Sequence, residues 1–337
     1  MKYLLLLLTT VLISFGTKKS KSNPYIVYTL YINKAETFIL NENYSDALQF
    51  YKKAFSINIK PIAKNCFTAM QVAALENDVK SFKSFSIKGL ERGLLATCFT
   101  KDSLISNFIS QNHLEDFITN NTKKATKKYS KSINHFLLDT IQKLSHIDNK
   151  WKIHYLDSLS YVDSNNKTKY REKYDSIVSD IVENKLIPII KKHGYPSERN
   201  INLEFVPNKN NPYNYSFSNN RTKLILLHYY SFPRTCDYND LLKNEVYRGN
   251  LTAEHFAEIM DFQAKYNEEK FCKVEYYNEW HQTKDSTKFE AINNRRLEIG
   301  LSPFQEKSQK YKRGQKICKE KKENINHNQV RLFYWCG

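Results

Sequence analysis

Glycine is scarce in this sequence, and none of its glycines belongs to a phosphate-binding loop. There are 8 glycines among 337 residues, and the patterns GxSxG and HExxH are absent. No two cysteines have CxxC spacing, and no histidine lies at zinc-ligand spacing from a cysteine. We therefore expect no structural metal and no cofactor, and the motifs of the common nucleotidases, α/β-hydrolases and zinc proteases are excluded.

Long apolar runs are also rare, since the only one is at the N-terminus. Lys2 precedes a nearly charge-free stretch, and Ser14-Phe15-Gly16 supplies small residues at a plausible cleavage point. The run is shorter than the roughly 20 residues of a membrane-spanning helix. We predict that residues 1–16 are a signal peptide and that the protein is exported, to the periplasm or outside the cell. The alternative is an uncleaved N-terminal anchor, and no other membrane contact is expected.

Positive charge is abundant but scattered. Lys and Arg number 52 against 35 Asp and Glu, which gives a formal net charge of +17. Such a balance favours acidic partners in general. No arginine-rich helix, zinc-finger spacing or ribonucleoprotein motif concentrates the charge, so we expect no nucleic-acid binding. Binding of acidic polymers is an alternative that requires the lysines to lie on one face.

The six cysteines permit disulfides in an exported protein. They allow fifteen pairings, and we favour Cys318 with Cys336 because this bond would fix the C-terminal tail. Cys66 lies on the apolar face of an expected helix, where it would equally well be a buried free thiol.

Residues 25–118 resemble tetratricopeptide repeats, that is, stacked pairs of helices. The first copy has large, small and aromatic residues at the repeat positions, which are Tyr31, Ala35, Phe38, Ala47, Tyr51 and Ala54. A second, degenerate copy follows at Ala69, Val72, Ser81 and Phe85. Two repeats need a cap, which Leu94–Phe117 would supply with one or two further helices. Such a platform either holds a protein or peptide partner or serves as a rigid spacer.

The rest of the chain is expected to form a helical domain, so the predicted fold class is all-α. Residues 119–132 are polar and basic without an apolar stripe, which indicates a solvated linker. The helical domain spans residues 133–307, and residues 308–337 form a tail. The oligomeric state cannot be derived from the sequence.

Within this domain, Leu186–Glu198 contains the signals for the end of a helix. An apolar stripe from Tyr174 to Ile190 indicates an amphipathic helix, which Pro188 should kink or restart. Lys191, Lys192 and His193 suit the last turn of a helix, Gly194 suits the left-handed position after it, and Pro196 prevents continuation. The following residues up to Asn220 indicate a loop, with a short extended segment at Leu203–Val206.

Four further helices are predicted after this loop. They cover Leu224–Phe232, Tyr238–Arg248 with Gly249 as its stop, Thr252–Tyr266 with Thr252 as N-cap, and Phe289–Gly300 with Pro303 beyond it.

The second domain resembles the uncharacterised bacterial domain-of-unknown-function family 6624. The residues that carry the resemblance are His193-Gly194-Tyr195-Pro196-Ser197-Glu198, Leu226-Leu227-His228, Leu251–Asp261, Asn294-Arg295-Arg296 and Ile299-Gly300-Leu301-Ser302-Pro303. The resemblance implies a helical architecture that often follows a signal peptide and tetratricopeptide-like repeats, and it implies no reaction. Leu227 stands where members have Gln, and Phe262 stands where they have Arg.

Polar residues at these motif positions are the candidate site. In one hypothesis His228 is a general acid or base, Asp261 orients it, and Arg295, Arg296 and Tyr195 bind an anionic substrate, as in a hydrolase-like enzyme. In the other, His228 is a core histidine and Asp261 pairs with Arg295 or Arg296 to fix helix packing. Gly194, Pro196, Gly300 and Pro303 are structural in both. We expect a binding or scaffold protein, with the enzyme as the alternative.

Overall fold

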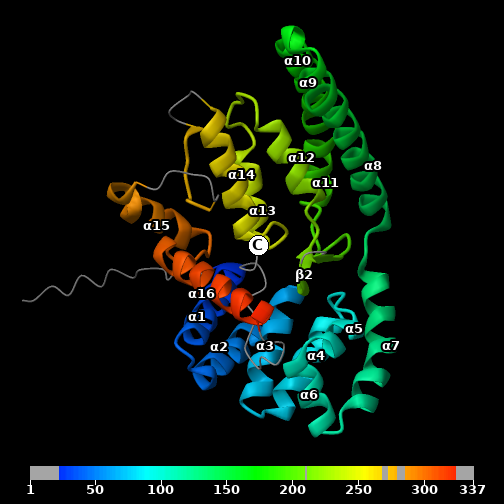
Figure 1. Ribbon diagram of the computed structural model, residues 1–337, viewed down its shortest axis with the longest axis vertical. Helices are drawn as coiled ribbons and strands as arrows, with labels where there is room; N and C mark the ends of the chain where they lie inside the picture. The colour runs from blue at the N-terminus through cyan, green and yellow to red at the C-terminus, as the bar shows by residue number, and fades with distance from the viewer. Residues whose placement is uncertain (1–22, 209–210, 268–271, 279–284, 324–337) are drawn as a thin grey trace, which may run out of the picture.

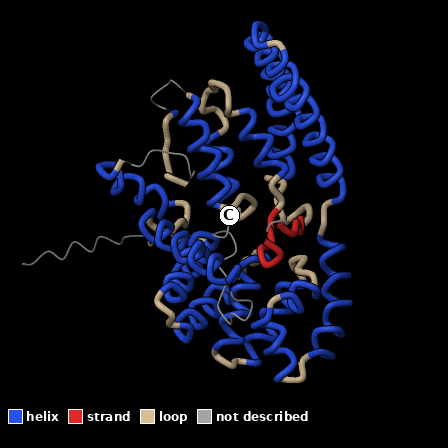
Figure 2. The backbone as a smooth tube through the Cα atoms, in the orientation of Figure 1, coloured by secondary structure: helices blue, strands red, loops and turns tan. Residues whose placement is uncertain are grey.

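The computed structural model describes residues 23–208, 211–267, 272–278 and 285–323. Most of these residues are helical, and the strands among them form one two-stranded hairpin (Figure 2). The all-α fold class is confirmed. In the described part of the chain no helix is both long enough and apolar enough to cross a membrane.

Two antiparallel helix pairs begin the fold. They are α1 (Pro24–Leu40) with α2 (Tyr44–Ser56) and α3 (Ala63–Leu75) with α4 (Val79–Leu90). Three of these helices begin at a side chain that accepts hydrogen bonds from the first turn, namely Asn23, Asn43 and Asp78. Ala35, Ala47, Ala54 and Ala69 are fully buried, because small residues allow close helix approach. The helix pairs lie where the repeat pattern predicted helices, whereas their membership of the tetratricopeptide class stays a prediction.

The next helices cap these pairs. Helix α5 (Ala96–Lys101) is followed by α6 (Ser103–Gln111), whose first turn is capped by Asp102. Residues predicted as a linker are instead helical and belong to α7 (Glu115–Ser132). The correction has a physical reason: Ile118 and Ala125 suffice to pack one narrow stripe of this polar helix, which lies along α4.

A long helical hairpin projects from the body (Figure 1). It rises through α8 (His135–Lys152), the π-helix η1 (Ile153–Leu159) and α9 (Ser160–Val162). After the 3-10 turn η2 (Ser164–Asn166), the chain returns through α10 (Lys167–Ser179). We call the residues from 135 to 179 the arm.

The return helix continues into the body as predicted. The π-helix η3 (Asp180–Leu186) leads into α11 (Ile187–His193), which restarts with Pro188 in its first turn. Gly194 then adopts a φ of +79°, and the helix ends there.

The segment after α11 contains a strand that the sequence prediction missed. The expected extended segment is β1 (Glu204–Asn208), which pairs in antiparallel fashion with β2 (Asn211–Ser218). We expected loop at β2 because Asn and Pro are frequent there. The alternation of Tyr213, Tyr215 and Phe217 is the strand signal that this composition obscured.

The helical segments after β2 include the four helices that the sequence predicted. They are α12 (Arg221–Tyr229), α13 (Asn239–Tyr247), α14 (Ala253–Tyr266), the 3-10 turn η5 (Ser286–Lys288), α15 (Phe289–Glu298) and α16 (Phe304–Glu323). The Thr252 side chain caps α14, and Gly249 and Gly300 have positive φ after their helices. The predicted tail is helical as far as Glu323, where the described residues end.

Helix α1, near the start of the described chain, contacts the segment around Gly300 and helix α16. The Asn33 side chain donates to the Gly300 carbonyl at 2.7 Å, and Lys310 of α16 pairs with Glu36 at 2.5 Å. A β-carbon at Gly300 would lie 2.1 Å from the Thr29 hydroxyl oxygen, so only glycine permits this approach. One contiguous apolar core runs from Tyr25 to Leu301, which means that the repeat-like helices and the later helices pack as one body.

Candidate functional site

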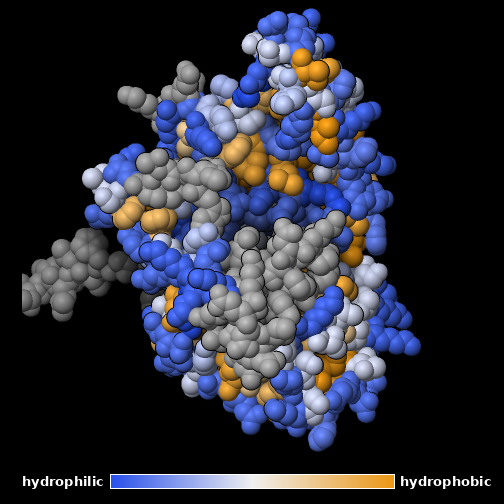
Figure 3. Space-filling view, in the orientation of Figure 1, coloured by the Kyte–Doolittle hydropathy of each residue, from blue (hydrophilic) through white to orange (hydrophobic). Residues whose placement is uncertain are grey.

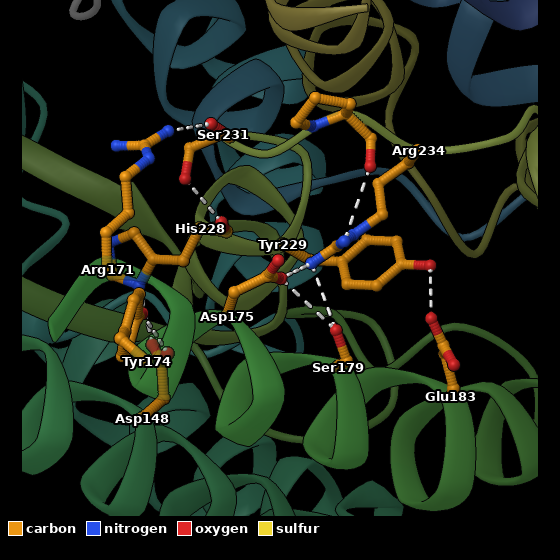
Figure 4. A network of polar contacts seen from close by, with 11 residues as sticks. Asp148, Arg171, Tyr174, Asp175, Ser179, Glu183, His228, Tyr229, Ser231 and Arg234 are labelled. Atoms are coloured by element: carbon orange, nitrogen blue, oxygen red, sulfur yellow. Dashed lines mark hydrogen bonds and ion pairs between the residues drawn. The ribbon is translucent and has the colours of Figure 1, made fainter. Parts of the chain in front are cut away.

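His228 lies near the C-terminal end of α12 and faces a buried carboxylate. Its Nδ1 atom is 2.6 Å from Oδ2 of Asp148, which belongs to α8 (Figure 4). The Tyr174 hydroxyl of α10 donates to the other oxygen of Asp148 at 2.6 Å. The Asp148 side chain is 3% exposed and that of His228 is 24% exposed. Burial and the neighbouring Asp148 charge raise the pKa of Tyr174, so this hydroxyl remains a donor.

A wider polar network surrounds this pair and ties α12 to α10 and η3. Arg171 donates to the Ser231 carbonyl at 2.8 Å, and the Tyr229 hydroxyl donates to Glu183 at 2.7 Å. Arg234 pairs with Asp175, and its guanidinium lies 4.3 Å from the centre of the Tyr229 ring. These contacts fix the position of the helix that carries His228.

The arrangement has part of the geometry of an acid–base catalyst. A carboxylate that accepts from Nδ1 leaves Nε2 available for proton transfer when the ring is neutral. Among the described residues, no hydroxyl or thiol forms a hydrogen bond with the His228 ring. The nearby Ser231 hydroxyl donates instead to the His228 carbonyl at 2.6 Å. The dyad therefore lacks an activated nucleophile, although water could serve as one.

Asp261 does not orient His228. It is fully buried on α14, and its carboxylate accepts the backbone N–H groups of Tyr276 and Asn278. The structure thus corrects the predicted pairing, because Asp148 occupies the place beside His228 that we expected for Asp261.

The two arginines also have structural contacts. Arg296 is 1% exposed and donates to the carbonyls of Ser302 and Tyr276, each at 2.7 Å. Burial lowers the pKa of Arg296 to about 10, and the Asp261 charge opposes this shift. Arg295 is half-buried and donates to the Glu275 carbonyl at 3.1 Å. Asp261 and Arg296 thereby hold residues 272–278 against α14 and α15.

Tyr195 is buried within the turn that follows α11. Its backbone N–H donates to the buried Glu245 carboxylate at 2.7 Å. Pro196 belongs to the same turn, and its carbonyl accepts from Thr222 at 2.9 Å. Because only 1% of Tyr195 is exposed, it is not placed to meet a ligand at the surface, and it lies apart from the network around His228.

A narrow cavity occurs elsewhere, beside α1. It is lined by α1 and α3 on one side and by Arg199, residues 252–254 and Gly300 on the other. The Arg199 guanidinium lies 5.1 Å from the centre of the Tyr25 ring. Within the described residues, no three His, Cys, Asp or Glu side chains gather in a way that could hold a metal ion.

The structure shows a disulfide that the sequence did not predict. Cys236 and Cys272 are bonded, which links the loop after α12 to the segment bound by Asp261 and Arg296. The predicted bond from Cys318 to Cys336 is not described, because Cys336 lies outside the described residues. Cys66 is a free buried thiol, and burial raises its pKa to about 12, which makes it unreactive.

Comparison with known proteins identifies no relative: no family model, no curated protein and no solved structure matches this chain. The resemblance to domain-of-unknown-function family 6624 and to tetratricopeptide repeats therefore stays a prediction.

Proposed function

We propose that this chain is an exported binding protein, in which the motif residues of the second half build the fold and the arm carries the recognition surface. The observation that supports this most is the burial of Asp261 and Arg296, whose side chains bind the backbone of the chain itself. A substrate could reach neither group without unfolding the segment 272–278.

The repeat-like helices serve as a support in this proposal. We first expected a protein or peptide partner on their surface. Part of α1 is however covered by the chain itself, because Asn33 contacts Gly300 and Glu36 contacts Lys310. The Tyr247 carbonyl also accepts from Asn23, the N-cap of α1, at 2.8 Å. The outer end of the arm lies far from these contacts (Figure 1).

Photo-crosslinking in cells of the source organism tests the proposal. A photo-reactive phenylalanine analogue would replace Val162 at the end of the arm and, as a control, the exposed Ser45 on α2. We expect a specific crosslinked product from position 162 and none from position 45. The proposal is wrong if position 162 yields no product while the protein is folded and exported.

A hydrolase-like enzyme is the second candidate, favoured by the contact between His228 and Asp148. It is tested by hydrolysis of ester, phosphoester and peptide substrates by the wild type and by His228→Asn. The binding proposal predicts equal rates for both proteins. A loss of turnover of about 100-fold or more in the variant, typical of a missing acid–base group, would favour the enzyme.

A further inference from the structure

The end of the arm exposes apolar side chains that the rest of the fold does not cover. Tyr161 is 88% exposed and Val162 is 79% exposed, where α9 ends. Ile153, eight residues earlier, is 46% exposed. Figure 3 shows apolar surface on the projecting arm near its free end. We call Tyr161 and Val162 the tip.

Stacked aromatic rings join the two sides of the arm below the tip. The rings of Trp151 and Tyr155 stack with centroids 5.5 Å apart, and Tyr155 stacks on Tyr170 of the returning helix at 6.3 Å. This aromatic ladder joins the two sides of the arm one or two turns below the tip. The exposed side chains are therefore presented by a packed element.

Basic residues outnumber acidic residues in the outer part of the arm. Between positions 150 and 173 there are six Lys or Arg and three Asp or Glu. Lys152 pairs with Asp157 at 2.8 Å, which neutralises one of these carboxylates. Lys167 and Lys169 are exposed and form no ion pair with any described residue.

Asp163 is the acidic group closest to the tip in sequence, and its contacts turn it toward the arm. It accepts from the Tyr170 hydroxyl and from the Asn166 side chain, both at 2.9 Å. These hydrogen bonds lower the pKa of Asp163 and keep it ionised. Asp163 is therefore held by groups of the arm, whereas Lys167 and Lys169 are exposed.

We infer that the tip inserts into the interface of an anionic lipid bilayer. Tyr161 and Val162 would enter the headgroup region, and Lys167 and Lys169 would meet lipid phosphates just behind them. A small convex apolar end with a basic collar suits a soft, negatively charged surface. This inference rests on the proposed function, and it extends membrane contact beyond the N-terminal segment to which we first confined it.

Vesicle sedimentation tests the inference. The probes are vesicles of phosphatidylcholine and vesicles in which about one third of the lipid is phosphatidylglycerol. The protein is used complete and also from Thr17, since the predicted targeting segment could itself bind lipid and the described fold begins only at Asn23. We expect binding to the anionic vesicles by both forms, and about tenfold or more weaker binding to the neutral vesicles.

Two pairs of variants distinguish the tip from the general surface. Tyr161→Ser/Val162→Ser should weaken the partition by about tenfold. Its control is Phe136→Ser/Leu224→Ser, which removes exposed apolar groups elsewhere and should leave the partition unchanged.

The charge variant is Lys167→Glu/Lys169→Glu, and its control is Lys124→Glu/Lys127→Glu on α7, where both lysines are exposed. The two variants change the net charge equally. We expect a loss of about tenfold or more on anionic vesicles for the first and less than about threefold for the second.

Equal binding by wild type and the Tyr161→Ser/Val162→Ser variant would overturn the inference, as would equal losses in the two charge variants. So would a wild-type protein that self-associates through the tip, shown by sedimentation velocity, without binding vesicles. In that case, or if position 162 crosslinks to a protein, the binding function stands and only the lipid assignment fails. If position 162 crosslinks to nothing and vesicles are not bound, both fail.

Discussion

The face of α1 and the tip of the arm use the same kinds of residue in opposite ways. On α1, charged side chains are buried and satisfied: Glu36 and Lys310 are 7% and 3% exposed and lie 2.5 Å apart. On the arm, Lys167 and Lys169 are exposed beside the uncovered Tyr161 and Val162. Where the chain pairs its charges internally it gains a fixed architecture. Where it leaves charged and apolar groups exposed together, a partner can bind.

The motif residues Asp261 and Arg296 resemble the buried and paired charges on α1. Asp261 and Arg296 have the chemistry of an active site, but both satisfy buried backbone groups, which is how the fold holds the irregular segment 272–278. His228 is intermediate, because one ring nitrogen is paired and the ring is partly exposed.

The largest expected effect is on stability, at Arg296. Arg296→Met leaves two buried carbonyls without their donor and removes the positive charge near Asp261, so we expect the free energy of unfolding to fall by about 3–5 kcal/mol. The adjacent, half-buried Arg295 is the control, and Arg295→Met should cost less than about 1 kcal/mol. Urea denaturation measures both. Similar losses at the two positions would show that the buried cluster does not hold the fold.

The next largest loss of stability is expected for the ion pair between Glu36 of α1 and Lys310 of α16. Lys310→Met removes the buried lysine from Glu36 and should lower the free energy of unfolding by about 2–3 kcal/mol. The more exposed pair of Arg313 and Glu42, also between α16 and the first helix pair, offers a matched control. Arg313→Met should cost less than about 1 kcal/mol. If both variants behave alike in urea denaturation, α16 is not anchored through Lys310.

Stability should also depend on pH through His255. Burial lowers its pKa well below the ordinary value, and the charges of Lys223 and Lys64 add to this shift. Below about pH 6.5 the unfolded chain therefore binds a proton that the folded chain does not. The contribution of His255 to the free energy of unfolding is complete above this pH. It decreases as the pH falls, by up to about 1.4 kcal/mol per pH unit.

The variant His255→Gln isolates that contribution. The difference in free energy of unfolding between wild type and variant, measured in urea, should shrink or reverse in favour of the variant between about pH 7 and pH 5. A constant difference over this range would mean that folded His255 takes up its proton normally.

The smallest stability effect is expected at the tip. Because Tyr161 and Val162 are almost fully exposed, Tyr161→Ser/Val162→Ser should change the free energy of unfolding by less than about 0.5 kcal/mol. Thermal denaturation followed by circular dichroism checks this value. A loss above about 2 kcal/mol would indicate that the tip is part of the packed structure.

Local patterns in the sequence predicted most of the helices. The apolar stripe before Ile190, the cap at Thr252 and the stops at Gly194 and Gly300 all involve residues within a few positions of one another, so they are visible in one dimension. Helix α7 was missed because its buried stripe is only Ile118 and Ala125.

The site depends on contacts between distant residues, and those were not predictable. Asp148 precedes His228 by 80 positions, and Cys236 and Cys272 are 36 apart. No local pattern marks such pairs. Asp261 was proposed as the partner of His228 only because both residues lie at motif positions of the family that the chain resembles. The exposed tip is likewise invisible in sequence, because Tyr161 and Val162 differ from buried residues only through the arm that carries them.

The central claim is that binding resides in the tip and not at His228. The most direct measurement is the partition onto anionic vesicles of His228→Asn beside Tyr161→Ser/Val162→Ser, with both proteins folded. We expect wild-type binding for His228→Asn and a loss of about tenfold for the tip variant. Loss of binding in His228→Asn with full binding by the tip variant would contradict it.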